Sequence, residues 1–341
     1  MKLRTVLGVA ALSIALTSTA ALAKGRLVVY CSNEPKACQT AVDLFAKKYD
    51  VKVQMTRTGS GSTYAKILAE KENPKGDVWY AGTLDPHSQA GVNGLLETYE
   101  SPMLSEIGEM FKNPATNKKH QTTGVYAGVL GYSVNTKLLA EKKLPMPQSW
   151  ADLTKPEYKG LVQVASPQSS GTAYTALSTL VQLWGEEDAY AYLAKLHQNV
   201  GQYTKSGSAP GKAAARGETL IGIGFLHDHA KQIKNGFPLQ LVVPSEGTGY
   251  EIGGLSILKG ARNQENAKKF VDFMLSKEGQ EIGATIDMFQ VPTNVTAAVP
   301  KEAIRLEDVN LIDYDFVKYG TEEMRSHLID RWVKEIKPMK R

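Results

Sequence analysis

The chain has 341 residues, of which 42% are hydrophobic and 22% are charged, a composition typical of a globular protein and unlike a disordered or fibrous one. Its formal charge is +5, and basic and acidic residues are interspersed along the whole chain. Because there is no basic block, the sequence does not indicate a nucleic-acid partner. So mild an excess of positive charge is compatible with an anionic small ligand but does not predict one.

The first residues have the pattern of a secretory signal peptide. Lys2 and Arg4 precede an apolar run over residues 6–16, and residues 21–23 form a small-x-small cleavage motif. The apolar run is too short to cross about 30 Å of hydrocarbon as a helix, and no later segment approaches about 20 uninterrupted apolar residues. We therefore predict cleavage after Ala23 and a free periplasmic protein. No cysteine follows the cut, so a lipid anchor is not indicated.

Strands and helices alternate in the first part of the mature chain. We expect strands at residues 27–30 and 77–80, which contain short apolar runs, and at residues 51–55, where apolar and polar residues alternate. A helix is expected after each strand, and an Asp-Pro pair at residues 85–86 is a suitable cap and first residue for the third helix. This alternation predicts a doubly wound α/β lobe.

The same alternation continues beyond a long apolar segment at residues 125–134, which we interpret as a crossing into a second lobe. A second apolar segment, at residues 252–258, is interpreted as the return crossing. The elements expected outside these crossings are strands at 161–165, 220–224 and 239–243, and helices at 172–184, 186–196, 266–279 and from 321 onward.

A chain of this length exceeds what one hydrophobic core usually organises, so two lobes are expected. The predicted division is a signal peptide at 1–23, the first part of lobe 1 at 24–124, lobe 2 at 125–251, and a return to lobe 1 with C-terminal helices at 252–341. The predicted fold class is α/β, with two doubly wound lobes and a hinged cleft between them.

Cys31 and Cys38 are the only two cysteines, and they lie around the first predicted strand-to-helix turn. In an oxidising compartment, an even number of cysteines first predicts a disulfide. The alternative is a pair of buried free thiols, because a bond across so short a segment requires a Cα separation below about 7 Å.

Three strand-to-helix junctions are rich in glycine and hydroxyl side chains, and helix N-termini at strand ends are where ligands bind in such sheets. Glycine lets a ligand approach the backbone, hydroxyl groups donate hydrogen bonds, and helix N-termini attract anions, so the junctions suit a phosphate group. The alternative is ordinary helix capping, which selects the same residues. The candidates at these and neighbouring strand ends are Ser32, Ser60, Ser62, Thr63, Thr83, Ser169, Ser170, Gly171, Thr172 and Ser206.

None of these junctions matches a nucleotide-binding or hydrolase motif. Between Gly207 and Gly211 stand three residues where a P-loop requires four, and Ala213 occupies the position of the magnesium-binding hydroxyl. A Gly-x-Ser-x-Gly nucleophile elbow is also absent from the sequence. We therefore predict no catalytic residue, no resident metal and no cofactor, and the protein is not expected to be an enzyme.

A second group of candidates lies at the end of the strand near residue 225 and at the return crossing. Asp228 and Glu251 would accept hydrogen bonds from sugar hydroxyls, and Tyr250 would supply an aromatic face. His227 would donate to a hydroxyl or a phosphate oxygen. Three alternatives stay open: Asp228 caps its helix, His227 and His229 bind a metal, or Glu251 pairs with a lysine. The metal is the weakest of them, because the other histidines show no ligand spacing with this pair.

Several segments resemble bacterial extracellular solute-binding proteins of the ferric-iron-binding type, and the resemblance covers essentially the whole mature chain. The segments that carry it are residues 206–210, 215–218, 222–228 and 266–279. Within that group, further segments are similar to the hexose-phosphate-binding members, at residues 28–32, 59–63, 167–174, 202–207, 225–228 and 246–251.

The resemblance implies the type II periplasmic-binding-protein fold and a role as the substrate-binding component of an ABC importer. It also implies a monomer with an inner-membrane permease as partner. Iron-binding members hold the metal with two adjacent tyrosines, and this chain has no such pair. At the comparable strand end it has His227 and Asp228, which favours a sugar phosphate such as glucose 6-phosphate.

By the same resemblance, Ser60 or Ser62 would contact the ligand together with His227, Asp228 and Glu251. Which of the two serines matches the family's residue is left open. Two alternative functions also stay open: binding of iron(III) or of another phosphorylated or phosphonate solute, and, less favoured, a phosphatase that uses His227 and Asp228.

Overall fold

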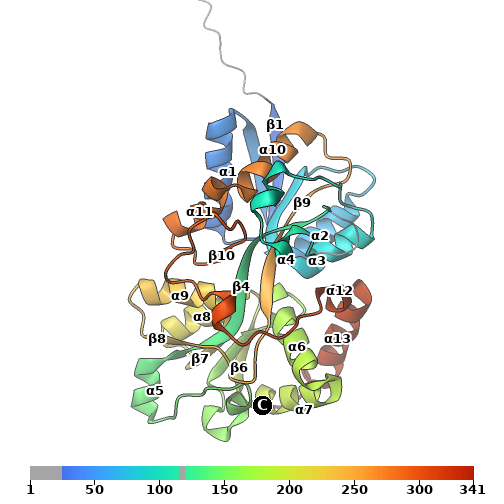
Figure 1. The fold of residues 1–341 in the computed structure, drawn as a ribbon. Coiled ribbons are helices and arrows are strands. Elements are labelled where there is room, and N and C mark those ends of the chain that lie inside the picture. Colours follow the sequence, from blue (N-terminus) through green and yellow to red (C-terminus); the bar gives the residue numbers. More distant parts are fainter. Residues whose placement is uncertain (1–24, 115–119) are drawn as a thin grey trace, which may run out of the picture.

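The computed structural model describes residues 25–114 and 120–341, so the predicted signal peptide lies outside the described residues. These residues form two lobes, one above the other in Figure 1, joined by long strands. None of the helices in the described ranges combines the length and the apolarity that crossing a membrane requires.

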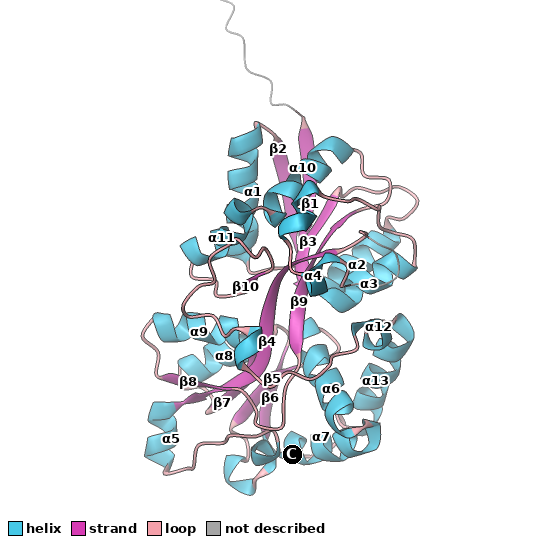
Figure 2. Ribbon diagram, in the orientation of Figure 1, coloured by secondary structure: helices cyan, strands magenta, loops and turns pink. Residues whose placement is uncertain are grey.

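Lobe 1 contains a sheet covered by helices on both faces (Figure 2). Its elements are β1 (Arg26–Cys31), α1 (Pro35–Tyr49), β2 (Lys52–Arg57), α2 (Ser60–Ala69), β3 (Val78–Thr83), α3 (Leu84–Val92), a 3₁₀ turn (Pro102–Glu106), α4 (Glu109–Lys112), α10 (Gln264–Leu275), α11 (Lys277–Thr285) and β10 (Val291–Pro292). β1 pairs in parallel with β2 and β3, as the predicted βα alternation requires.

Lobe 2 is built on the same plan. Its elements are α5 (Thr136–Lys142), 3₁₀ turns (Ala151–Thr154 and Pro156–Tyr158), β5 (Val162–Ala165), α6 (Gly171–Trp184), α7 (Glu186–Asn199), β6 (Val200–Thr204), α8 (Ala209–Ala215), β7 (Ile221–Phe225), α9 (Leu226–Lys234) and β8 (Leu239–Val242). β5 pairs in parallel with β6 and β7, so both lobes are doubly wound, which confirms the predicted fold class.

Strands β4 (Thr123–Asn135) and β9 (Tyr250–Ile257) join the lobes. The first half of β4 pairs with β9, whereas residues 130–135 pair with β7 and β8 of lobe 2. The strand order is therefore β2-β1-β3-β9-β4-β7-β5-β6. Every residue of β4 and β9 is buried, because both faces of these strands are covered, and this explains their continuous apolar character in the sequence.

The C-terminal segment makes a third passage between the lobes that the sequence did not predict. β10 pairs with β4 in lobe 1, but Leu311 already bridges to Thr248, and α13 (Glu322–Glu335) packs against α6 of lobe 2. The predicted segment 252–341 is thus divided between the two lobes. The amphipathic face of α13 buries Leu328 and Trp332 there. The remaining short elements of this segment are α12 (Phe316–Tyr319) and a 3₁₀ turn (Leu306–Asp308).

Two predicted helix boundaries differ from the structure. The helix expected at 266–279 is interrupted at Ser276, whose Oγ accepts a hydrogen bond from the Gly279 amide (3.2 Å) and so begins the new helix α11. Asp85 does not cap α3, because that helix already begins at Leu84, with Thr83 in the cap position.

Cys31 and Cys38 are joined by a disulfide, and their Cα atoms lie 6.0 Å apart. The bond links the end of β1 to the first turns of α1. The first of the two sequence alternatives is therefore confirmed.

We expect the purified, unreduced protein to show no reactive thiol after denaturation. Replacement of both cysteines by alanine should lower the free energy of unfolding by about 2 kcal/mol, because the bond restricts the unfolded chain over a short loop. Thiol counting and chemical denaturation check the two statements. Two reactive thiols in the unreduced protein would contradict the disulfide.

Candidate functional site

A cavity of about 390 Å³ lies between the lobes. All of the candidate ligand-binding residues line it except Thr63 and Tyr250. The lining comes from strand ends and helix starts of both lobes, as expected for the carboxyl ends of strands in α/β sheets. Residues predicted separately at distant sequence positions are therefore brought to one cavity.

The hydroxyl-bearing residues form a connected rim across the lobe boundary. Ser60 Oγ, at the start of α2, accepts a hydrogen bond from the Thr83 amide (3.1 Å). Thr83 in turn meets Gly171 at the start of α6, where a Cβ atom would lie 2.5 Å from Thr83 Oγ1. Only glycine permits this approach, so the rim of lobe 1 touches the rim of lobe 2 at this point. Ser170 also caps α6 through the Ala173 amide (3.3 Å), which shows that capping and cavity lining coincide here.

Thr63 lies behind the rim instead of lining the cavity. It is buried, and its hydroxyl contacts Ser32 Oγ (3.0 Å) and Thr58 Oγ1 (2.6 Å). Ser32 also accepts a hydrogen bond from Trp79 Nε1 (3.0 Å). Thr63 therefore supports Ser32 and the loop before α2, and the expectation that it faces a ligand is wrong because its side chain is on the inner side of the helix.

His227, Asp228 and Glu251 form a second group on the cavity wall. His227 Nε2 lies 3.6 Å from Glu251 Oε1 and 3.8 Å from Asp228 Oδ1, too far for hydrogen bonds. Within the described residues, no hydrogen bond to either carboxyl group is present, although the side chains are only 5% (Glu251) and 16% (Asp228) exposed. Buried carboxyl groups normally have partners, so this wall is short of hydrogen-bond donors.

Burial dominates the protonation of this group. It lowers the pKa of His227 to about 4 and raises the pKa of Asp228 to about 7, with the charge of Glu34 adding to the second shift. Burial, and then the charge of Asp228, also raises the pKa of Glu251 well above its ordinary value. His227 is therefore neutral near pH 7. Because burial disfavours the charged form of the two acids, hydrogen bonds donated by a bound ligand would lower their pKa values.

The alternatives for these residues can be compared with the geometry. Asp228 lies in the first turn of α9, but that helix has no side-chain cap, so capping is not its role. Glu251 has no lysine partner among the ion pairs of the described residues. His229 does not form a metal site with His227, because its Nδ1 contacts Ser133 Oγ (2.8 Å) in lobe 2. In residues 25–114 and 120–341, no group of three His, Cys, Asp or Glu side chains is arranged to hold a metal ion.

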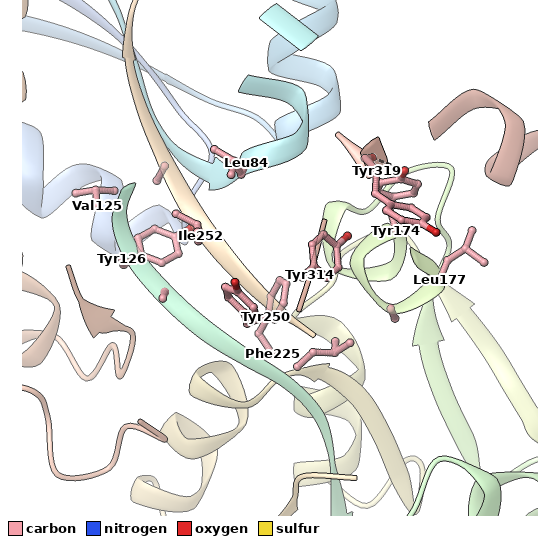
Figure 3. Packing of buried hydrophobic residues seen from close by; sticks show 14 of the residues in the cluster. Leu84, Val125, Tyr126, Tyr174, Leu177, Phe225, Tyr250, Ile252, Tyr314 and Tyr319 are labelled. Atoms are coloured by element: carbon pink, nitrogen blue, oxygen red, sulfur yellow. Dashed lines mark hydrogen bonds between the residues drawn. The ribbon is translucent and has the colours of Figure 1, made fainter. Parts of the chain in front are cut away.

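Tyr250 points away from the cavity, which corrects its predicted role as the aromatic face. Its ring packs against Tyr314 (6.2 Å between ring centroids) and Phe316 (5.2 Å) in the core. Figure 3 shows Tyr250 on β9 beside Tyr314. Since successive residues of a strand face opposite sides, Glu251 in the cavity requires Tyr250 to be on the other face. The aromatic lining comes instead from Tyr126 and Phe225.

Several lining residues, among them two cations, were not predicted from the sequence. Arg57 directly precedes the glycine- and hydroxyl-rich junction at residues 58–63, and Lys205 directly precedes Ser206. A basic residue next to a glycine- and hydroxyl-rich turn is the signal that could have identified them. Asn33, Glu34 and Gln290 also line the cavity, but the sequence carries no comparable signal for them.

Two α/β lobes with a polar cavity between them define a binding protein that encloses a small solute. The chain belongs to the bacterial extracellular solute-binding protein family, which residues 77–319 match. It is therefore a small-molecule-binding component of an ABC importer, in a family whose members function outside the cytoplasmic membrane.

Individual relatives agree with this assignment. A solved structure of the periplasmic binding protein AfuA from Actinobacillus pleuropneumoniae, with exogenous fructose 6-phosphate bound, is 56% identical, covers 93% of this chain and 100% of its own, and has a TM-score of 0.90. An uncharacterized protein of Haemophilus influenzae is 55% identical over 322 residues, 94% of this chain and 93% of its own. The Fe(3+)-binding periplasmic protein of Serratia marcescens is only 26% identical over 319 residues, 91% of each chain.

The raised pKa of Asp228 predicts a pH-dependent effect of Asp228→Asn on the ligand-free protein. Because the folded state holds this proton up to about pH 7 and the unfolded state only to about pH 4, the contribution of Asp228 to stability falls as the pH rises between those values. The variant cannot ionise there, so its stability relative to the unaltered protein should increase by on the order of 2 kcal/mol between pH 4 and pH 8.

Urea denaturation of both proteins at the two pH values measures this difference. His227 has the opposite shift, but it is present in both proteins, so its contribution cancels from the comparison. Glu251 adds to the difference in the same direction, because loss of the Asp228 charge lowers the pKa of Glu251. A difference in stability that stays constant with pH would show that Asp228 is not desolvated in the folded protein.

Proposed function

We propose that this protein captures a hexose phosphate in the cavity between its lobes and delivers it to an ABC importer. The observation that carries the proposal is the pair of buried carboxyl groups, Asp228 and Glu251, which line the cavity without a hydrogen-bond partner among the described residues. Sugar hydroxyls are the donors that such groups lack.

The phosphate group would bind at the hydroxyl rim. Helices α2 and α6 both begin at the cavity, so their N-termini direct partial positive charge toward it. Arg57 and Lys205 add two full charges, and Ser60 and Ser62 both line the cavity as hydroxyl donors. Ser60 Oγ already accepts from the Thr83 amide, which leaves its own hydrogen free for a phosphate oxygen.

The sugar would bind at the cavity wall that carries the two carboxyl groups. Asp228 and Glu251 would accept hydrogen bonds from hydroxyls, and His227 Nε2, which lies between the two carboxyl groups, would add one further polar contact. Tyr126 and Phe225 would supply the apolar surface on which the faces of a sugar ring pack.

This division of charge favours a monophosphate with an uncharged polyol. A second phosphate at Asp228 and Glu251 would repel their ionised forms and so raise the pKa of both acids further, which is costly inside a desolvated cavity. The bound fructose 6-phosphate in the 56% identical AfuA structure supports this ligand class. Iron(III) is less suitable, because the chain has no adjacent tyrosine pair and His227 and Asp228 stand at the comparable strand end.

In this proposal the leader at residues 1–23 directs the chain to the periplasm, where it acts as a monomer. Ligand binding closes the lobes, and the closed protein docks on an inner-membrane permease that a separate ATPase drives. The protein itself needs no cofactor, binds no nucleic acid and catalyses no reaction.

Fructose 6-phosphate and glucose 6-phosphate should raise the melting temperature, whereas free fructose and fructose 1,6-bisphosphate should have little effect. At about 100 times Kd, the stabilisation by one ligand is about 2.7 kcal/mol. Differential scanning fluorimetry followed by calorimetry measures both effects. A shift with ferric citrate and none with any sugar phosphate would favour the iron alternative, and phosphate released by the unaltered protein but not by His227→Ala would favour the phosphatase.

Glu251→Gln should weaken binding of fructose 6-phosphate by roughly ten- to hundred-fold, because hydrogen bonds from ligand hydroxyls favour the ionised carboxylate and hydrogen bonds to a charged group contribute about 1.5–3 kcal/mol. Its ligand-free stability should not fall, since Glu251 has no partner to lose among the described residues. Calorimetry and thermal denaturation of the same variant separate the two quantities.

Glu246→Gln is the matched control, because Glu246 accepts hydrogen bonds from the Trp150 and Ala151 amides (3.0 and 2.9 Å) and does not line the cavity. It should lower stability and leave affinity unchanged. If Glu251→Gln instead destabilises the ligand-free protein and binds normally, Glu251 is a structural residue and the sugar site is wrongly placed.

A further inference from the structure

The last helix, α13, is anchored on lobe 2 but reaches lobe 1. Its anchors on lobe 2 include the Leu328 carbonyl, which accepts from Tyr190 Oη, and Arg331, which pairs with Glu186 (2.7 Å) and Glu187 (2.8 Å) of α7. Its N-terminal end follows α12, which contacts α3 of lobe 1. In Figure 2, α12 and α13 lie beside lobe 2, directly below α2 and α3.

Arg325 of α13 makes the principal contact with lobe 1. Its Nη1 lies 2.8 Å from Asp85 Oδ2 of α3, and the two side chains are only 14% and 9% exposed. The guanidinium of Arg325 also lies 4.4 Å from the ring centre of Tyr174, on α6 of lobe 2. This ion pair is therefore buried at the boundary between the two lobes, outside the cavity lining.

A second polar contact accompanies the ion pair. Tyr64 Oη of α2 donates to Glu322 Oε2 (3.2 Å) at the start of α13. On the lobe 2 side, Tyr174 Oη donates to the Tyr319 carbonyl, and Figure 3 shows these two tyrosines together. The N-terminal end of α13 thus binds lobe 1 through two side chains while it is held by lobe 2.

The ion pair lies directly behind the rim of the cavity. Asp85 is two residues after Thr83, and Tyr174 is one turn after Gly171, and Thr83 and Gly171 are the residues at which the two lobes touch. Because Asp85 belongs to α3 of lobe 1 and Arg325 to a helix anchored on lobe 2, a movement that separates Thr83 from Gly171 would also draw Asp85 away from Arg325. Neither charged residue lines the cavity, so neither touches the ligand.

We propose that the Asp85–Arg325 ion pair is a latch that holds the lobes closed over the bound solute. Opening would break this short charge-assisted contact. Because stacking on Tyr174 already orients the guanidinium toward Asp85, the pair forms with little further ordering of the side chain, so it favours the closed form. Because apparent affinity depends on the population of the closed form, the latch sets how long the ligand stays bound although it does not contact the ligand. The proposal rests on the proposed function only for the choice of ligand.

Arg331 supplies a matched control on the same helix. It also stacks on a tyrosine of lobe 2, at 4.2 Å from the ring centre of Tyr190, and it also pairs with carboxylates. Those carboxylates belong to lobe 2, so its contacts do not change when the lobes separate. Both variants therefore remove a carboxylate ion pair and a stacked guanidinium. Arg325→Gln removes them across the lobe boundary, and Arg331→Gln removes them within lobe 2.

The experiment measures binding of fructose 6-phosphate to both variants by calorimetry and stopped-flow fluorescence. Arg325→Gln should raise Kd by about ten-fold or more through a faster dissociation rate, with little change in the association rate. Arg331→Gln should lower the melting temperature but keep Kd within about twofold. Asp85→Asn should reproduce the effect of Arg325→Gln, and the double variant should bind no more weakly than either single variant.

Equal Kd values for Arg325→Gln and Arg331→Gln would overturn the latch. If Arg325→Gln does not fold, Asp85→Asn removes the same ion pair from the lobe 1 side, and an unchanged dissociation rate in that variant overturns the proposal in the same way.

If the unaltered protein binds no sugar phosphate, the proposed function fails. The latch is then tested separately, by measuring the distance between the lobes in the ligand-free protein. Spin labels at Glu109→Cys of lobe 1 and Lys142→Cys of lobe 2 report the distance between the lobes. A longer mean distance in Arg325→Gln, but not in Arg331→Gln, supports the latch, and an unchanged distance overturns it.

Discussion

The pairing of β4 with β9 at the point where both strands cross between the lobes determines what the cavity contains. Gly128 is opposite Glu251, and Val129 is opposite Tyr250. Because side chains alternate along a strand, this register directs the Glu251 carboxyl into the cavity and the Tyr250 ring into the core. Gly128 leaves the space that His227 and Glu251 occupy, since a Cβ atom there would overlap the imidazole. A shift of one residue would exchange a carboxyl group for an aromatic ring at the binding surface.

The two buried carboxyl groups lower the stability of the ligand-free protein but strengthen the hydrogen bonds that a ligand can make to them. Desolvation without internal hydrogen bonds raises the pKa of both Asp228 and Glu251. A solvated pair at the same position would bind sugar hydroxyls more weakly, because water would compete for the same oxygens. The hydroxyl rim is organised differently, since Ser60 and Ser170 already make hydrogen bonds within the protein. One part of the cavity is therefore preorganised for an anion, and the other is left short of donors.

Closure of the lobes is connected to these surfaces through contacts outside the cavity. Glu34 of lobe 1 accepts from Ser208 (3.0 Å) of lobe 2 at the edge of the cavity, and Arg325 pairs with Asp85 beyond the rim. Both contacts join elements that begin or end at the ligand-binding loops. The Arg325–Asp85 contact depends on the path of the C-terminal tail. The tail places α13 against α6 of lobe 2, while the first turn of α13 lies beside α3 of lobe 1.

The sequence alone determined the α/β class, the two lobes, the crossing strands and the hydroxyl-rich junctions, because these depend on local periodicity, turn chemistry and strand ends. It favoured a disulfide over two free thiols, but the separation of Cys31 and Cys38 in the folded chain decided between them. It could not decide which face of β9 meets the cavity, so Tyr250 was assigned to the ligand and Tyr126 was missed. It also could not place the amphipathic tail, since the spacing of Leu328 and Trp332 predicts a buried face but not the lobe that buries it. Strand register, the inner side of α2 and the partner of Arg325 were decided only by tertiary structure, because each depends on residues that are far apart in the chain.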